Sequence, residues 1–278
     1  MRIIGFHSGH DSSYGILEDG IPLVHNELER FNRRKNSVED SLKFFNQHSQ
    51  KENIIIDSIT THRTCGIIDN NYIESLNKCE NKLNPKVKSK NKLIITGHHQ
   101  AHASNAFFTS DFKESLIVTI DGGGIDYLNG DTHKKSTIDK EGSGAITTCT
   151  TFWYGVDNKI EPIKMIDKGK INLGKDWALC TSKIFGLGTC KDPRGDQAGT
   201  VMGMAALGNP KKYLSYFKGK LTVGLFRNDN KGAINFNYLN QESNKSEQNK
   251  FDIAASLQQE TEMVIKNLLT PLIKKHQP

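Results

Sequence analysis

The stretch GHHQAHASNAFFTSDFKESLIVTIDGGG, residues 97–124, decides the fold of this chain. Its first half combines histidines with small and aromatic residues and predicts a helix directly after the apolar strand 91–97. Its second half, 115–124, is an apolar run that ends in three glycines, which predicts a buried strand followed by a tight turn. Strand, helix and strand in this order are typical of a sheet covered by helices.

The residues before this stretch show the same alternation of strands and helices. Asp19-Gly20 is a hairpin signal between two apolar runs. We expect strands at 2–9, 12–20, 21–30 and 53–62, and helices at 37–49 and 68–83. The order β-β-β-α-β-α-β-α therefore predicts one mixed α/β unit over residues 1–114.

From residue 115 the pattern starts again. We expect strands at 115–124, 144–155, 158–167, 221–227 and 232–239, and helices at 175–188 and 251–276. Two units that each open with three strands resemble the actin, hexokinase and Hsp70 type of ATPase fold. We therefore expect an actin/Hsp70-like fold with two RNase H-like lobes, residues 1–114 and residues 115–278, the second of them incomplete.

Composition excludes several classes of protein. The 278 residues are 36% hydrophobic and 24% charged, with a mean hydropathy of −0.54, which fits a folded polar chain. Apolar runs stay short of the about 20 residues that span a bilayer. The five cysteines never form a CxxC pair, which favours a reducing, cytoplasmic location. The net charge of +6 is diffuse, which favours a solvated surface over a nucleic-acid face.

Two histidines and one aspartate suggest a metal site. His98 and His102 are four residues apart, so both imidazoles lie on one side of a helix. Asp121 ends an apolar strand and could add a carboxylate, and this donor set suits Fe(II), zinc or manganese. The alternatives are histidines that cap the helix or lie at its surface, and an aspartate that only begins a glycine turn.

Other polar positions could bind an anion or act as an acid or base. His10 could contact a phosphate or polarise a carbonyl, and His99 could line the same cleft. For the glycines, serines and arginine named next, the alternatives are an ordinary turn, a run of solvated charges or close packing of a helix. The residues that could contact a carbamoyl group or nucleotide are Gly9, His10, Ser12, Ser13, Arg30, Gly122, Gly123, Gly124 and Gly203.

These motifs together resemble the carbamoyltransferase family that includes the nodulation-factor and antibiotic O-carbamoyltransferases. The stretch 97–124 is similar to the HHxxHAxSAFxxSxFxxAxxxTxDGxG core of that family. Thr200 stands where the family usually has lysine, and Leu28 and Asn36 also depart from its pattern. The further matching segments are 5–20, 27–35, 173–188, 198–210 and 251–262.

The resemblance implies both a reaction and roles for individual residues. Members of the family make carbamoyl adenylate from carbamoyl phosphate and ATP, and their actin-like N-terminal domain transfers the carbamoyl group to an acceptor hydroxyl. That domain is related to the tRNA threonylcarbamoyl-transfer enzymes. The resemblance implies that His98, His102 and Asp121 bind a metal, often iron, and that His10 or His99 takes the hydroxyl proton. A further metal-binding aspartate of the family has no counterpart in this chain.

The last residues of the chain raise a question of completeness. The adenine-contacting GGxxxN segment of the family is expected after the helix 251–276, beyond Pro278. We expect either a part of a longer enzyme or one half of a split enzyme completed by a second polypeptide. The rivals are a non-catalytic actin-like module that binds a metal or a partner, and a sugar-kinase-like phosphotransferase. The small-molecule acceptor could be a sugar, an aminocyclitol, a nucleoside or a modified nucleobase hydroxyl.

Overall fold

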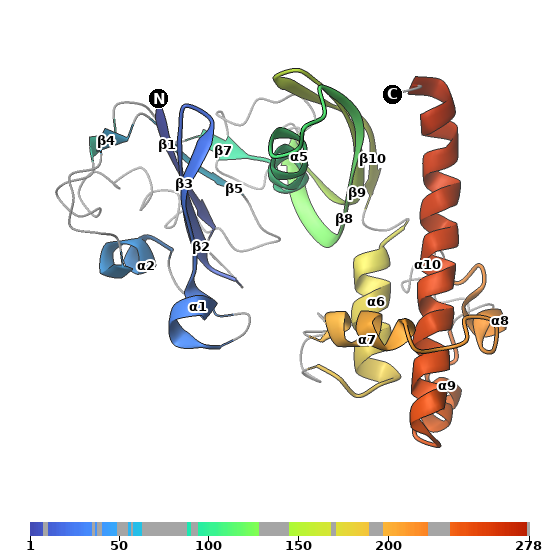
Figure 1. Cartoon of the computed structure of the whole chain (residues 1–278). Helices are drawn as coiled ribbons and strands as arrows, with labels where there is room; N and C mark the ends of the chain where they lie inside the picture. Colours follow the sequence, from blue (N-terminus) through green and yellow to red (C-terminus); the bar gives the residue numbers. More distant parts are fainter. Residues whose placement is uncertain are drawn as a thin grey trace. The chain divides into compact units, whose positions relative to one another are not determined.

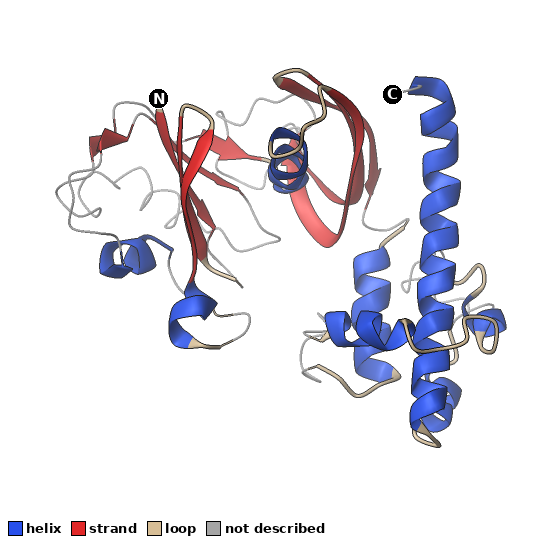
Figure 2. Ribbon diagram, in the orientation of Figure 1, coloured by secondary structure: helices blue, strands red, loops and turns tan. Residues whose placement is uncertain are grey.

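The computed structural model is a mixed α/β protein, as the sequence predicts (Figures 1 and 2). Its contacts divide the chain into two compact units. One contains Met1–Ala101 and Gly124–Ile146, and the other contains His102–Gly123 and Thr147–Pro278. The structure describes residues 1–7, 11–34, 37, 41–48, 55–56, 58–62, 88–89, 94–127, 145–167, 171–188, 197–221 and 234–276. The expected helix at 68–83 lies outside these residues.

A five-stranded sheet, in the order β3-β2-β1-β5-β7, forms the first unit (Figure 1). The first three strands are antiparallel, and β5 and β7 continue the sheet in parallel with β1. The turn at Asp19-Gly20 has φ values of 50° and 83°, the left-handed pair that a two-residue hairpin needs. The strands are β1 (Arg2–His7), β2 (Ser13–Glu18), β3 (Ile21–Glu27), β5 (Ser58–His62) and β7 (Ile94–Thr96). The short strands β4 (Ile55–Ile56) and β6 (Lys88–Ser89) pair in a separate parallel sheet.

Two helices follow the hairpin strands, α1 (Leu28–Asn32) and α2 (Ser41–His48). The expectation of a strand through residue 30 is wrong, because the chain turns into α1 at Leu28, whose side chain is buried. Two buried rings of α2, Phe44 and Phe45, pack against aromatic rings of β1 and β2. This aromatic cluster fixes the helix on the sheet.

The helix α5 (His98–Phe108) and a three-stranded sheet form the next part of the fold (Figure 2). The strand order is β10-β9-β8, with β8 at Glu114–Tyr127, β9 at Ala145–Val156 and β10 at Lys159–Asp167. A small core of buried side chains joins α5 to this sheet, formed by Ala103, Phe107, Ile117 and Trp153. The ring of Phe107 lies over Gly155, where a Cβ would come within 2.8 Å of it.

The rest of the second unit is helical and has an extensive core of buried side chains. Its helices are α6 (Leu173–Lys183), α7 (Ala198–Ala205), α8 (Leu214–Phe217), α9 (Phe236–Ser243) and α10 (Glu247–His276). Fully buried members of this core include Ile184, Phe217, Leu239, Ile253 and Leu257. The expectation of a strand at 232–239 is wrong, because Asn235 caps a helix there by accepting the backbone N–H of Tyr238.

A stripe of polar residues on α10 holds the chain before and after α8. Asp252, Ser256 and Glu260 are four residues apart, so they lie on one face of the helix. All three are buried, and they accept the backbone N–H groups of Asn209, Tyr213 and Gly219, respectively. The buried polar residues of the motif 251–262 therefore stabilise the fold by binding backbone N–H groups.

Within the described part of the chain, no helix has both the length and the apolar character that crossing a membrane requires.

Candidate metal centre

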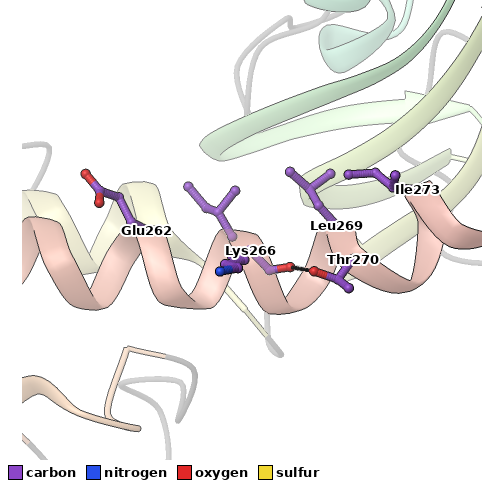
Figure 3. A pocket seen from close by; sticks show the side chains of 6 residues that line it. Glu262, Lys266, Leu269, Thr270 and Ile273 are labelled. Atoms are coloured by element: carbon purple, nitrogen blue, oxygen red, sulfur yellow. Dashed lines mark hydrogen bonds between the residues drawn. The ribbon is translucent and has the colours of Figure 1, made fainter. Parts of the chain in front are cut away.

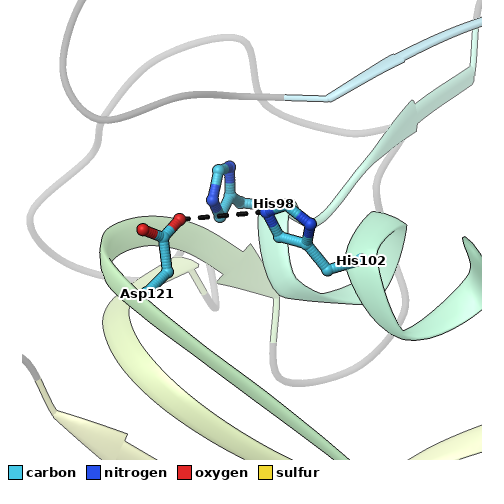
Figure 4. Close-up of side chains that lie close together, drawn as sticks. All are labelled: His98, His102 and Asp121. Atoms are coloured by element: carbon cyan, nitrogen blue, oxygen red, sulfur yellow. Dashed lines mark ion pairs between the residues drawn. The ribbon is translucent and has the colours of Figure 1, made fainter. Parts of the chain in front are cut away.

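The side chains of His98, His102 and Asp121 lie close together (Figure 4). One donor atom from each lies within 4.8 Å of the other two. His102 Nε2 is 3.8 Å from Asp121 Oδ2. The two histidines occupy successive turns of α5, as their spacing predicts, and Asp121 lies on β8.

The chemistry of this cluster fits a divalent metal ion. Imidazole nitrogens and a carboxylate oxygen are ligands of zinc, iron(II) and manganese. Two donors that are each about 2.1 Å from one ion lie at most about 4.2 Å apart. Small side-chain rotations would bring these donors into that range, and His102 and Asp121 have room for them because their side chains are 57% and 41% exposed.

The first turn of α6 supports the backbone at Asp121. Asn172 Nδ2 donates a hydrogen bond of 2.9 Å to the carbonyl oxygen of Gly122. Gly174 lies so close that a Cβ there would come within 2.6 Å of the carbonyl carbon of Asp121. The Gly122 N–H also donates to Asp121 Oδ1, at 2.5 Å. These contacts fix the position from which the carboxylate projects.

The glycines after Asp121 differ in their surroundings. Gly124 is buried, and a Cβ there would lie 2.6 Å from His98 Cβ and closer still to two ring carbons. Gly123 has a φ of 152°, and Gly122 is exposed. The absence of a side chain at Gly124 thus lets β8 pass directly against the His98 ring.

His99 is completely buried and pairs with Asp126, a residue that is not among the candidates expected from the sequence. Its Nδ1 is 2.6 Å from Asp126 Oδ2. Asp126 is 1% exposed, and its Oδ1 accepts the backbone N–H of His99 at 2.9 Å. An acidic residue inside a strand is itself a signal, because carboxylates are almost never fully buried without partners.

The other selected residues lie in several parts of the fold. Ser12 is buried and its carbonyl oxygen accepts the N–H of Leu28, whereas Ser13 begins β2. Arg30 is an exposed residue of α1 whose Nε lies 3.3 Å from a carboxylate oxygen of Glu27. Gly203 lies in α7 with open space around it. Gly9 and His10 lie outside the described residues.

An unusual carboxyl group lies on α6, the helix that supports Asp121. Asp176 is 4% exposed, and burial raises its pKa to about 8, although the nearby Lys175 acts in the opposite direction. Among the described residues its Oδ2 has no hydrogen-bond partner. A carboxyl group in this setting is protonated at neutral pH.

A shallow hollow lies on the surface of α10, and none of its lining residues belongs to the metal cluster (Figure 3). Its lining residues come from the second half of that helix and are Glu262, Ile265, Lys266, Leu269, Thr270 and Ile273. Thr270 Oγ1 donates to the carbonyl oxygen of Lys266, so this hydroxyl is used within the helix.

Comparison with known proteins identifies the family. The family described as Carbamoyltransferase N-terminus matches residues 19–276, so the chain belongs to this family. An uncharacterized protein of Methanocaldococcus jannaschii is 27% identical over 174 residues, which cover 61% of this chain and 32% of that protein. The nodulation protein NolNO of Sinorhizobium fredii is 28% identical over 140 residues, which cover 44% of this chain and 20% of that protein. The chain thus spans about a third or less of the length of these relatives.

Proposed function

We propose that this chain is the N-terminal, group-transferring part of an O-carbamoyltransferase. It would transfer a carbamoyl group from carbamoyl adenylate, made from carbamoyl phosphate and ATP, to an acceptor hydroxyl. The observation that carries the proposal is the cluster of His98, His102 and Asp121 in a chain of the carbamoyltransferase N-terminus family. A sheet that opens with three antiparallel strands and continues in parallel supports an actin-like fold, for which we propose lobes at 1–114 and 115–278.

In this proposal His98, His102 and Asp121 hold a divalent ion, with Fe(II) first and zinc or manganese as alternatives. The ion would supply Lewis acidity toward a carbonyl or hydroxyl oxygen. The chain's own contribution is a rigid setting, because α6 supports Asp121 and β8 lies against His98.

The transfer step needs a base for the acceptor hydroxyl. The hydroxyl oxygen forms a bond to the carbamoyl carbon, the bond from that carbon to the phosphate oxygen breaks, and AMP leaves. We assign the hydroxyl proton to His10, because the His99 ring is completely buried. The proposed contacts for the nucleotide are Gly9, Ser12, Ser13, Arg30, Gly122, Gly123, Gly124 and Gly203.

The relatives are longer than this chain, so we propose that the complete enzyme includes a further segment that forms the adenylate. That segment could lie in the same polypeptide or in a second one. We propose a cytoplasmic enzyme whose acceptor is a small molecule, with no role for nucleic acid or membrane.

Metal analysis tests the centre directly. We expect the purified chain to hold about one equivalent of metal, and the double variant His98→Ala/His102→Ala to hold none. His25→Ala is a matched control, because it removes a histidine of β3 from the same sheet unit. Stoichiometric metal in the double variant would contradict the assignment.

Transfer is tested with labelled carbamoyl phosphate, ATP and a separately expressed adenylate-forming domain. Sugars, aminocyclitols and nucleosides are offered as acceptors, and labelled product is expected with one of these classes. Loss of product with His10→Ala, while metal is retained, supports the proposed base. Metal binding without transfer to any acceptor would instead favour a non-catalytic metal-binding module.

A further inference from the structure

We propose that Asp126 is the positioning residue of the metal centre. Its carboxylate fixes the first turn of α5, so that His98 and His102 are held in place before an ion binds. The inference rests on the metal centre proposed above, and it adds a residue that does not itself touch the ion.

The hydrogen bonds of Asp126 converge on the start of α5. Oδ1 accepts the backbone N–H of His99 at 2.9 Å and of Gln100 at 3.3 Å. These donors have no partner inside the helix, because the first N–H groups of a helix precede its own hydrogen bonds. The first helical bond, from the Ala101 N–H to the Gly97 carbonyl oxygen, follows directly. A carboxylate here is also stabilised by the positive end of the helix dipole.

The second oxygen of Asp126 fixes a side chain. Oδ2 lies 2.6 Å from Nδ1 of His99, whose ring is 0% exposed. The His99 ring packs edge-on against the His98 ring, with centroids 5.1 Å apart. One carboxylate therefore holds two backbone N–H groups, those of His99 and Gln100. It also holds the His99 ring, which packs against the ring of the proposed ligand His98.

Two glycines leave the start of α5 little freedom to move. A Cβ at Gly97 would lie 2.6 Å from Asp126 Oδ1, and a Cβ at Gly124 would overlap the His98 side chain. The carboxylate and β8 thus approach the helix start as closely as a glycine backbone allows. A shift of the first turn would collide with one of these contacts.

The position of Asp126 on β8 connects the anchor to the third ligand. Asp121 lies five residues earlier on the same strand. This strand therefore carries one proposed ligand, Asp121, and also Asp126, which anchors the helix α5 that carries the other two proposed ligands. Groups that orient metal ligands typically change metal affinity by about 10–100-fold when they are removed. We expect a loss in this range.

Cobalt(II) binding to the full chain tests the inference, because its visible spectrum reports ligand geometry. We expect Asp126→Ala to weaken Co(II) binding by about 10–100-fold and to alter the spectrum. Asp126→Asn keeps an oxygen that can accept the two backbone N–H groups, so it should restore part of the affinity. The expected order of affinity is wild type, then Asn, then Ala.

Asp252→Asn is the matched control for removal of a buried, hydrogen-bonded carboxylate. Asp252 is 3% exposed, accepts the Asn209 N–H and lies 2.9 Å from Lys212 Nζ. It belongs to α10, so its replacement should lower the unfolding temperature and leave Co(II) affinity and spectrum unchanged. A merely structural effect of Asp126 would give the same pattern as this control.

Two outcomes separate the inference from the function on which it rests. A wild-type chain that binds no Co(II), or His98→Ala and His102→Ala variants that bind it as tightly, would overturn the metal centre and the inference together. Normal binding by the wild type with equal affinity and spectrum in Asp126→Ala would overturn the positioning role alone. If Asp126→Ala does not fold, the Asp126→Asn variant decides by the same comparison.

Discussion

Replacement of Gly124 by alanine tests whether β8 sets the position of His98. Gly124 is buried on β8, and an added Cβ would lie 2.6 Å from His98 Cβ and closer still to two carbons of its ring. Carbon atoms in contact prefer separations of about 3.5–4.0 Å. The His98 side chain must therefore move by about 1 Å or more, or the strand must bend away from α5.

The size of the effect follows from this overlap. Overpacking a buried site by one methyl group typically costs about 1–3 kcal/mol. If this free energy is lost from the metal-bound position of the His98 ring, each 1.4 kcal/mol lowers metal affinity about tenfold. We expect Gly124→Ala to bind a divalent metal about 10–100-fold more weakly than the wild type.

Gly122→Ala is the control, two residues earlier on the same strand. A Cβ there meets nothing closer than Lys175 N at 4.0 Å, so it should leave affinity unchanged. Competition with a chromophoric chelator gives the dissociation constants, and circular dichroism verifies that both variants are folded. Equal metal affinity in the two variants would refute the packing argument for His98.

Further predictions concern stability and are checked by urea unfolding. Burial raises the pKa of Asp176 to about 8 in the folded state. Between about pH 4 and pH 8 the folded chain therefore keeps the proton of this carboxyl group, whereas the unfolded chain loses it. Wild-type stability should therefore fall as pH rises through this window, and Asp176→Asn should remove that fall and gain at least about 1.4 kcal/mol relative to wild type between pH 5 and pH 8. Leu257→Ala removes a fully buried side chain of the main core and should cost about 2–5 kcal/mol. Gly208→Ala should be destabilising by at least about 1–3 kcal/mol, because its Cβ would overlap the backbone carbonyl of Phe251. Gly203→Ala in α7 meets open space and should instead stabilise by about 0.5–1 kcal/mol, so a loss there would contradict the described packing.

The sequence is informative where structure depends on neighbours in the chain. The Asp19-Gly20 turn has the conformation that these two residue types favour, and α5 places His98 and His102 one turn apart. Both features follow from periods of a few residues, which a sequence displays directly. The family motifs in 97–124 add the identity of the family, which the comparison with known proteins confirms.

Local patterns fail where tertiary packing overrides them. The apolar residues at 236–239 look like a strand, but Asn235 caps a helix there and Leu239 packs fully buried in the helical core. Leu28 likewise ends a strand early, because burial of its side chain turns the chain into α1. In both segments the gain from burial against distant residues exceeds a weak local preference.

By itself, the sequence determines the hairpin, the alternation of strands and helices, and the spacing of the histidines. Only the tertiary structure shows that Asp126 binds the start of α5 across 27 residues of chain, and that Asp252 reaches Asn209 across 43. Such contacts depend on which segments meet in space, and a linear pattern of residue types does not encode that. The same holds for Gly124, whose missing side chain has meaning only because the His98 ring lies against it.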